Sequence, residues 1–198
     1  SMARTKAFDE ATVLESAMNI FWTKGYCSTS LEDLVTGLGI SRSSMYDTFS
    51  DKRTLFFAAL KLYHSQYAQA MIEMLSRTTA VLPVFKQILH TTVEESLATP
   101  IAKGCFMVNS AIEIAQTDEE ITGFIAHNNS LVEDAFMKAI ERGQKNGELS
   151  PKQSAEALAQ FVFNTVTGMR VLAKSRPKRE QLENICTVVL SCLEKTVE

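Results

Sequence analysis

The chain has 198 residues, a formal net charge of −3 at pH 7, and a hydrophobic fraction of 45%. Four prolines and eight glycines are few for this length, and residues with high helix propensity are abundant, so the composition predicts an all-α globular protein. It excludes a helical membrane span, because no apolar run approaches the ~20 residues that a span requires.

The start of the chain is polar and lacks the apolar stretch of a signal peptide, so we expect a cytoplasmic protein. The cysteines form no C-x-x-C pair, and the histidines show no metal-ligand spacing. We therefore expect reduced thiols, no cofactor and no metal. The residues concerned are Cys27, Cys105, Cys186, Cys192, His64, His90 and His127.

Three short helices are predicted in the first 50 residues. Apolar residues at helical spacing predict the first helix over residues 9–24, and Gly25 marks its end. Ser30 and Asp33 form an acidic variant of the capping box, which predicts a second helix to residue 38. Gly39 interrupts the pattern, and Ser41 is placed to cap a third helix that ends at residue 49. The result is a helix, a tight glycine turn and a second helix.

Six further helices follow, which gives about nine in all and no strand. We expect them over residues 50–77, from Pro83 to just before Pro100, over 105–116, over 117–143, over 151–174 and over 179–197. Thr117 and Glu120 form a second capping box. The sequence Ser150-Pro151-Lys152-Gln153 combines a cap, a first-turn proline and a capping glutamine, and it predicts the most clearly marked helix start in the chain.

Residues 25–57 read GYCSTSLEDLVTGLGISRSSMYDTFSDKRTLFF, and this contiguous segment resembles the helix-turn-helix of the TetR family of transcriptional regulators. The resemblance implies a three-helix DNA-binding domain over residues 1–53. It also implies a helical effector-binding and dimerisation domain over residues 54–198, with the fourth helix shared between the two. The last two helices are expected to pack against their twofold copies, which sets the two recognition helices about one DNA turn apart, ~34–36 Å.

The chemistry of the third helix indicates how DNA is read. The second helix of such a unit lies in the major groove, where Arg42 is able to bond to both O6 and N7 of guanine. Ser43 and Ser44 would bond to several bases or to phosphate. The resemblance adds phosphate contacts from Thr29, Tyr46 and Lys52. Acidic and basic residues are equal in number over residues 1–63, so DNA attraction has to come from local placement, and the role of Asp47 is open.

Residues 104–116, GCFMVNSAIEIAQ, are similar to a segment of one broad group of TetR effector domains. The polar residues Asn109, Glu113 and Gln116 lie at helical spacing. They either face solvent or line a pocket that orients a ligand. Abundant methionine and phenylalanine would make such a pocket apolar and adaptable, or they are simply core. The candidate ligand-binding residues are Cys105, Asn109, Glu113, Phe124 and Asn128.

Cys105 follows Lys103-Gly104 at a helix start, where the helix dipole and a nearby ammonium favour the thiolate. Either this residue senses oxidants or electrophiles, or it is a small buried core residue.

The sequence therefore predicts a ligand-responsive repressor that binds a palindromic operator as a homodimer and is released by a small hydrophobic or reactive effector. An enzyme is the rival class, but no G-x-S-x-G, Walker A or G-x-G-x-x-G segment is present. A second rival is a helical adaptor that keeps the dimer and has lost DNA binding.

Overall fold

The computed structural model describes residues 8–114 and 116–197, and throughout these it contains helices and turns but no strand. The all-α prediction is confirmed. In chain order the elements are α1 (Glu10–Lys24), α2 (Leu31–Leu38), α3 (Arg42–Phe49), α4 (Lys52–Tyr63), the π-helical segment η1 (His64–Ala68), α5 (Gln69–Arg77), α6 (Val81–Ser96), α7 (Phe106–Ile114), α8 (Glu119–Lys145), α9 (Ala155–Leu172), the 3₁₀ segment η2 (Ala173–Ser175) and α10 (Arg179–Leu193).

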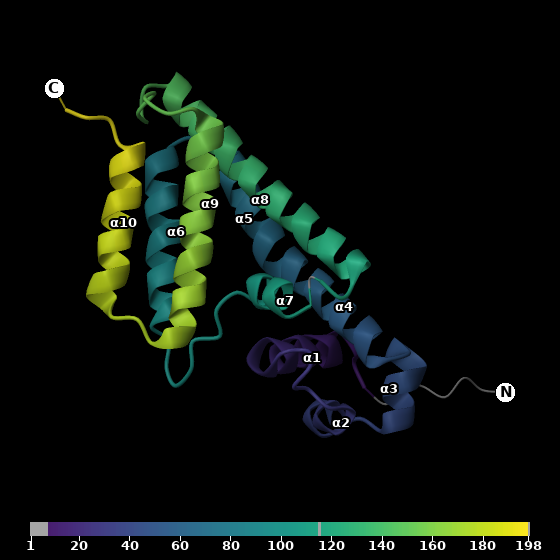
Figure 1. The fold of residues 1–198 in the computed structure, drawn as a ribbon. Coiled ribbons are helices and arrows are strands. Elements are labelled where there is room, and N and C mark those ends of the chain that lie inside the picture. Colours follow the sequence, from purple (N-terminus) through teal and green to yellow (C-terminus); the bar gives the residue numbers. More distant parts are fainter. Residues whose placement is uncertain (1–7, 115, 198) are drawn as a thin grey trace.

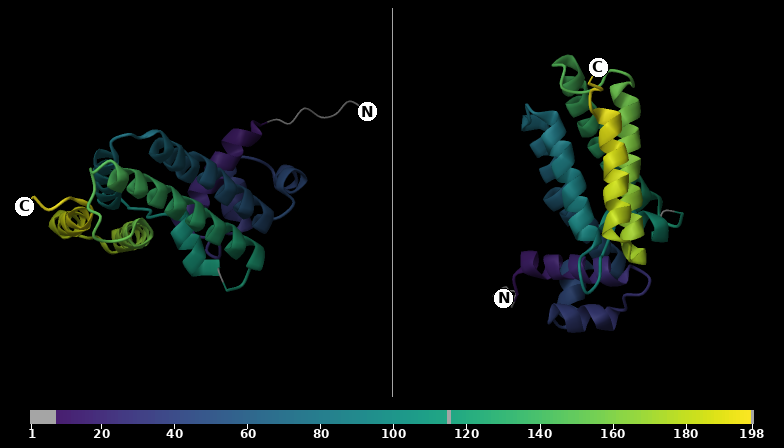
Figure 2. Two further views of the ribbon diagram at one scale, coloured as in Figure 1. Left: turned by 90° about the horizontal axis from the view of Figure 1, so that it is seen from above. Right: turned by 90° about the vertical axis from the view of Figure 1, so that its left-hand side faces the viewer.

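The helices form a small group at one end and a larger bundle at the other (Figures 1 and 2). Helices α1, α2 and α3 make up the small group, and α6, α8, α9 and α10 belong to the bundle, with α5 packed against α8. The rod formed by α4, η1 and α5 runs from the small group into the bundle, as expected for a shared fourth helix.

The first three helices begin and end where the sequence predicts. The Asp9 carboxylate accepts from the N–H of Ala11 at the start of α1. Ser30 and Asp33 exchange hydrogen bonds of 3.0 and 2.9 Å, which is the reciprocal pattern of a capping box. Gly39 ends α2 with φ of +65°, a conformation that costs little without a Cβ. Ser41 caps α3.

Two predicted helix caps are wrong. Helix α9 is capped by Ser154, whose Oγ accepts from Ala157 N, and not by Ser150. Ser150 is buried instead, and its N–H donates to the carbonyl of Leu193 at the end of α10. The start of α8 is capped by Asp118, one residue after Thr117, because a carboxylate accepts from the N–H of Ile121. In α9, the predicted start at Ser150 is therefore not used, and Ser150 contacts Leu193 of α10 instead.

Helix α6 starts at Val81, two residues before Pro83. Its first N–H groups have no partner within the helix, and the Glu148 carboxylate accepts from Val81 N at 2.9 Å and from Leu82 N at 2.8 Å. The acceptor comes from 67 residues further along the chain, so the local sequence does not show it. Helices α9 and α10 also end earlier than predicted, at Leu172 and Leu193.

Two hydrophobic cores support this arrangement. One joins α5, α6, α8, α9 and α10. The other joins α1 to α4 but also contains Cys105, Phe106 and Met107 near the start of α7, and Ile121 and Ile125 from α8. The N-terminal helices therefore pack directly on α7. The division after residue 53 stays a prediction.

The described part of the chain has no helix with the length and hydropathy needed to cross a bilayer. It also brings together no group of three His, Cys, Asp or Glu side chains suited to a metal ion.

Candidate DNA-binding surface and effector cavity

Helix α3 has one buried and one exposed face. Met45 and Phe49 are buried in the core of the N-terminal helices, at 1% and 7% exposure. Arg42, Ser43 and Tyr46 project outward, with Tyr46 40% exposed. This division follows from the helical period, because positions 45 and 49 are one turn apart. The exposed face therefore carries hydrogen-bonding groups that do not contribute to the core.

The other predicted DNA-contact residues differ in availability. Ser44 is partly exposed and its Oγ accepts a 2.8 Å hydrogen bond from Ser41. Lys52 begins α4, and its Nζ lies 4.3 Å from the centre of the Tyr26 ring. Thr29 is fully buried, and its hydroxyl donates to the Gly25 carbonyl at 2.5 Å. The Thr29 side chain thus holds the turn between α1 and α2, and it does not lie on the exposed face.

Glu113 links α7 to the end of α1. Its Oε1 accepts from the backbone N–H of Tyr26 at 2.5 Å and of Cys27 at 3.1 Å. The approach is close because Gly25, with φ of +86°, has no side chain. A Cβ built there would lie 2.5 Å from Glu113 Oε2. The Glu113 carboxylate therefore binds the turn between α1 and α2.

Arg53 in α4 forms a second link, with the N-cap of α8. Its Nε and Nη2 donate to the two carboxylate oxygens of Asp118 at 2.6 and 3.0 Å, which is a bidentate geometry. The Arg53 guanidinium, together with the N–H of Ile121, lowers the pKa of Asp118 to about 2.

A third link brings α1 to the loop before α7. The Trp22 indole donates to the Gly104 carbonyl at 3.2 Å, and Lys103 Nζ lies 4.3 Å from the centre of a Trp22 ring.

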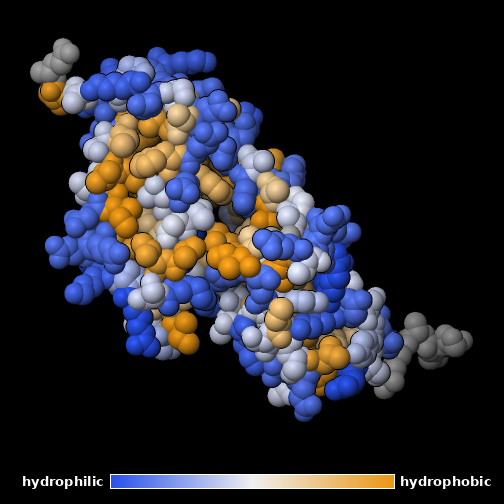
Figure 3. All heavy atoms as spheres, viewed as in Figure 1, coloured by the Kyte–Doolittle hydropathy of each residue, from blue (hydrophilic) through white to orange (hydrophobic). Residues whose placement is uncertain are grey.

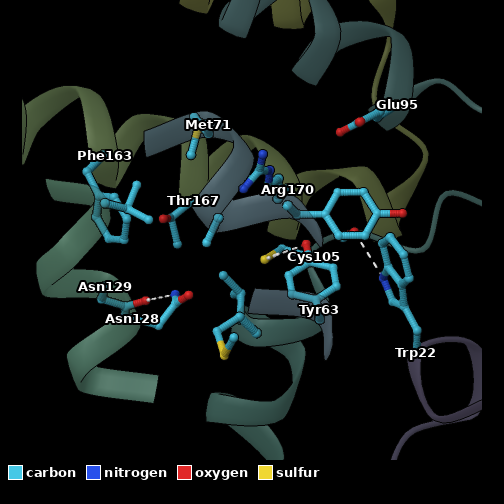
Figure 4. Close-up of a pocket in the computed structure, with 16 residues that line it drawn as sticks. Trp22, Tyr63, Met71, Glu95, Cys105, Asn128, Asn129, Phe163, Thr167 and Arg170 are labelled. Carbon is cyan, nitrogen blue, oxygen red and sulfur yellow. Dashed lines mark hydrogen bonds between the residues drawn. The ribbon is translucent and has the colours of Figure 1, made fainter. Parts of the chain in front are cut away.

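A cavity of about 130 Å³ lies beside this third link (Figure 4). Trp22 comes from α1, Tyr63 from the end of α4, Arg170 from α9 and Asn128 from α8, so both the N-terminal helices and the bundle contribute to its wall. Its lining is Trp22, Tyr63, Tyr67, Ala68, Met71, Glu95, Gly104, Cys105, Met107, Val108, Asn128, Asn129, Val132, Phe163, Thr167 and Arg170.

The side chains of Arg170, Cys105 and Tyr63 lie next to one another in the cavity wall (Figure 4). The Tyr63 hydroxyl donates to Cys105 Sγ at 3.3 Å. Burial raises the pKa of Tyr63, and the neighbouring Cys105 adds to the rise. Burial acts to lower the pKa of Arg170, but Cys105 and Tyr63 outweigh it and raise that pKa. At neutral pH the cavity therefore holds a protonated phenol and a guanidinium cation beside the Cys105 sulfur.

The structure places two of the five predicted ligand-binding residues, Cys105 and Asn128, in the cavity wall. Asn109 donates to the carbonyl of Lys103 and supports the loop before α7. Phe124 packs against the Phe57 ring, with centroids 5.4 Å apart. Glu113 is bound to the α1–α2 turn and Gln116 is exposed. The three polar residues at helical spacing, Asn109, Glu113 and Gln116, therefore do not line this cavity.

Sequence reasoning missed Trp22, Tyr63, Tyr67 and Arg170. One signal was present in α9, where Phe163, Thr167 and Arg170 recur at i, i+4 and i+7 and share one helix face. The contribution of Trp22 had no such signal, because it depends on how α1 packs against the loop before α7.

Comparison with known families identifies both halves of the chain. A family model described as bacterial regulatory proteins of the tetR family matches residues 13–59, and one described as a tetracyclin repressor-like C-terminal domain matches residues 85–194. The chain belongs to the TetR family. It is therefore a transcriptional regulator.

Two relatives match this TetR chain along nearly its whole length. It is 34% identical to the uncharacterised HTH-type transcriptional regulator YezE of Bacillus subtilis, over 98% of this chain and 100% of that protein. It is 29% identical to the HTH-type transcriptional repressor ComR of Escherichia coli, over 96% of this chain and 91% of that one.

Solved structures give the same family fold. A cysteine-substituted form of the TetR family regulator CifR, complexed with a 26-base-pair double-strand operator DNA, superposes with a TM-score of 0.84 at 27% identity and covers 96% of this chain and 100% of its own. The reduced form of NemR from E. coli superposes with a TM-score of 0.85 at 19% identity over 95% of this chain and 98% of its own, a likeness of fold alone.

Proposed function

We propose that this TetR-family chain is a repressor that binds a palindromic operator as a homodimer and leaves it when a small hydrophobic or reactive effector enters the cavity. The observation that carries the proposal is the wall that Trp22 contributes, because a ligand there would touch α1 of the DNA-binding helices and α9 of the bundle together. The relative ComR is named a repressor, which supports the direction of control.

The proposed DNA contacts divide into two kinds. Arg42 reads a base pair, and Ser43 and Ser44 bond to bases or phosphate at the start of α3. Tyr46 and Lys52 hold phosphates, which fixes the register of α3 without reading sequence. Thr29 acts through the α1–α2 turn, because its own side chain is buried. The DNA-binding domain of this proposal spans residues 1–53, and the effector and dimer domain spans residues 54–198.

Surface composition supports a dimer through α9 and α10. Hydrophobic residues gather at the surface where α6, α9 and α10 lie (Figure 3). The exposed positions of α9 and α10 include a stripe on each helix that has no charged residue. These positions are Ala157, Phe161, Asn164, Gly168 and Val171 on α9, and Gln181, Asn184, Val188 and Ser191 on α10. An uncharged exposed stripe is typical of the centre of a protein interface.

Release follows from the links between the two parts. A ligand shifts the equilibrium between DNA-bound and released forms by its difference in affinity for the two. Gly104 and Cys105 line the cavity. The Gly104 carbonyl accepts the hydrogen bond from Trp22, and Cys105 directly precedes α7, the helix that carries Glu113. A ligand that displaces this loop would therefore move α1 and, with it, the spacing of the two α3 helices. A thiol-reactive effector would act on Cys105.

The DNA contacts are tested by fluorescence-anisotropy titration of the intergenic DNA beside the gene. Loss of one bidentate base contact costs about 1–3 kcal/mol. We therefore expect Arg42→Ala to weaken operator binding about 5-fold to 150-fold. Tyr46→Phe loses about 1 kcal/mol of phosphate hydrogen bonding. Arg77→Ala is the control, because Arg77 is exposed in the last turn of α5. Full affinity in the Arg42→Ala, Tyr46→Phe double variant would contradict the contact assignment.

The direction of control is tested separately in cells. We expect deletion of the gene to raise transcription from the promoter that carries the operator, and addition of the effector to do the same. A fall in transcription on deletion would show an activator.

A further inference from the structure

A second cavity of about 170 Å³ adjoins the one in Figure 4. The two share Trp22, Tyr67, Glu95, Gly104 and Arg170 in their linings. A dry cavity of about 150 Å³ is large enough to bind benzene. The second cavity exceeds this volume and the first falls just short of it, so the two adjoining cavities together have room for a single ring with a small polar group.

Arg170 is the charged group that sets the chemistry of the first cavity. It is partly buried, and no carboxylate of the described residues forms an ion pair with it. Glu95 acts on it only at longer range. A desolvated cation without a bonded anion is unfavourable, so the site favours a partner that brings negative charge.

The approach of Cys105 to Arg170 is built into the backbone. Gly104 has φ of +68°, and a Cβ there would lie 3.0 Å from the Arg170 carbonyl. The loop before α7 therefore passes directly over α9, and Cys105 and the Tyr63 hydroxyl that bonds to it are held beside the guanidinium. The Tyr63 hydroxyl is able to turn from the thiol to an oxygen anion, because its hydrogen rotates about the C–O bond.

Aromatic rings surround this polar centre. The Trp22 and Tyr63 rings lie 5.1 Å apart edge to face, and those of Tyr63 and Tyr67 stack at 4.7 Å. Phe163 lies across the cavity from Tyr63 (Figure 4), and the apolar side chains of Met107 and Val132 also line it. A flat apolar group beside the guanidinium would be covered on several sides.

We propose that the effector is a compact organic anion with one aromatic ring, whose carboxylate pairs with Arg170 and accepts from Tyr63 while its ring lies toward Met107, Val132 and Phe163. This inference rests on the proposed function, because it names the ligand class of the same cavity. Glu95 lines both cavities and repels such a ligand, so the carboxylate lies on the Cys105 side of the guanidinium.

Isothermal titration calorimetry of the full chain without DNA tests the charge requirement. The probes are benzoate, its neutral analogue benzamide and the cation benzylamine, which have nearly the same shape. A charge-assisted hydrogen bond is about twice as strong as a neutral one, so we expect benzoate to bind about tenfold or more tightly than benzamide. Benzylamine is expected to bind weakest. Equal or tighter binding of the neutral or cationic probe, or no benzoate binding at millimolar concentration, overturns the proposal.

Three variants test whether Arg170 is the cation that binds the carboxylate of benzoate. Arg170→Met keeps the side-chain bulk, and we expect it to weaken benzoate binding about tenfold while benzamide binding changes less than about threefold. Arg77→Met removes the same charge from an exposed site and should leave both affinities unchanged. Glu95→Gln should strengthen benzoate binding, since it removes a repulsion. Unchanged benzoate affinity in Arg170→Met, or weaker binding in Glu95→Gln, contradicts the assignment. The three-probe comparison needs no variant, so it decides the matter even if Arg170→Met does not fold.

Trp22 supplies an independent readout, because it is the one tryptophan in the sequence and lines both cavities. Benzoate binding in the cavity should change Trp22 fluorescence with the same Kd that calorimetry gives. Operator titrations then separate the two proposals. Benzoate binding without operator release would leave the ligand class standing and contradict effector release, whereas operator release by neutral compounds alone would do the reverse.

Discussion

Glu113 joins the bundle side of the molecule to the turn that leads into the helix-turn-helix. One carboxylate oxygen accepts from two backbone N–H groups, of Tyr26 and Cys27, and these groups have no helical partner because α1 has already ended. The side chain is exposed, so water competes for these bonds.

We expect Glu113→Ala to lower the free energy of unfolding by about 1–2 kcal/mol, the usual loss when hydrogen bonds to a charged group are removed. Urea denaturation followed by circular dichroism measures this value. Glu73→Ala is a matched control, because Glu73 is an exposed glutamate on α5. Equal stability of the two variants would show that the Glu113 contacts contribute nothing to the fold.

The Arg53–Asp118 pair predicts a pH dependence of stability. The pKa of Asp118 falls from an ordinary value of 3.8 to about 2 in the folded chain. A lowered pKa means that the unfolded chain binds the proton more readily, so the stabilisation is complete above about pH 4 and is lost as the pH falls toward about 2.

Asp118→Asn removes the charge and keeps a good N-cap for α8. We expect the stability difference between the native chain and this variant to be largest near neutral pH and to shrink steadily below about pH 4. Denaturant titrations across this range test the prediction. A difference that does not change with pH would exclude the ion pair as its cause.

At the scale of elements, the caps show what local sequence predicts and what it does not. The starts of α2 and α3 depend on residues within three positions, and Ser30, Asp33 and Ser41 predicted both. The start of α9 does not, because Ser150 is withdrawn into a contact with Leu193 near the C-terminus and Ser154 takes over the cap. The cavity could not be predicted from local sequence either, because its wall combines residues of α1, α4, α7, α8 and α9 that no single periodicity connects.

The Ser154 cap is open to a direct test. We expect Ser154→Ala to cost about 1 kcal/mol of stability, because Ala157 N then loses its side-chain acceptor. Ser154→Asp should keep the stability of the native chain, since a carboxylate caps equally well. Thermal unfolding of both variants gives the comparison, and equal losses in both would argue against a capping role.

The long rod is not one regular α-helix. A π-helical segment, His64–Ala68, separates α4 from α5 and carries Tyr67, which lines the cavity next to Tyr63 at the end of α4. Interruptions of this kind commonly occur at functional sites. The apolar period of residues 55–74 predicted the rod but not the interruption, since one extra residue in a turn hardly changes the pattern.

For the molecule as a whole, Gly168 offers the sharpest test of the proposed dimer. It lies on the uncharged stripe of α9, and a Cβ built there meets no atom within 4 Å in the single chain. Glutamate has a better helix propensity than glycine, by about 0.5–1 kcal/mol. Gly168→Glu should therefore leave the protomer folded and place a charge in the proposed interface.

We expect Gly168→Glu to be monomeric at micromolar concentration, where the native chain is dimeric, by sedimentation velocity. Gly123→Glu is the control, because Gly123 lies exposed on α8 and its Cβ position is equally open. A native chain that is itself a monomer, or a dimer that tolerates the charge at Gly168, would contradict dimerisation through this stripe.

The core shared by α1, α4 and α7 also matters for anyone who wants to rewire such regulators. The Phe56 ring packs edge-on against Phe106, 5.6 Å away, and the same core includes Phe21, Ile121 and Ile125. A chimera that exchanges residues 1–53 alone would set a foreign α1 against the original α7. Carrying residues 104–125 along with the new DNA-binding helices would preserve both sides of that contact, so that the exchanged helices keep the neighbours they pack against.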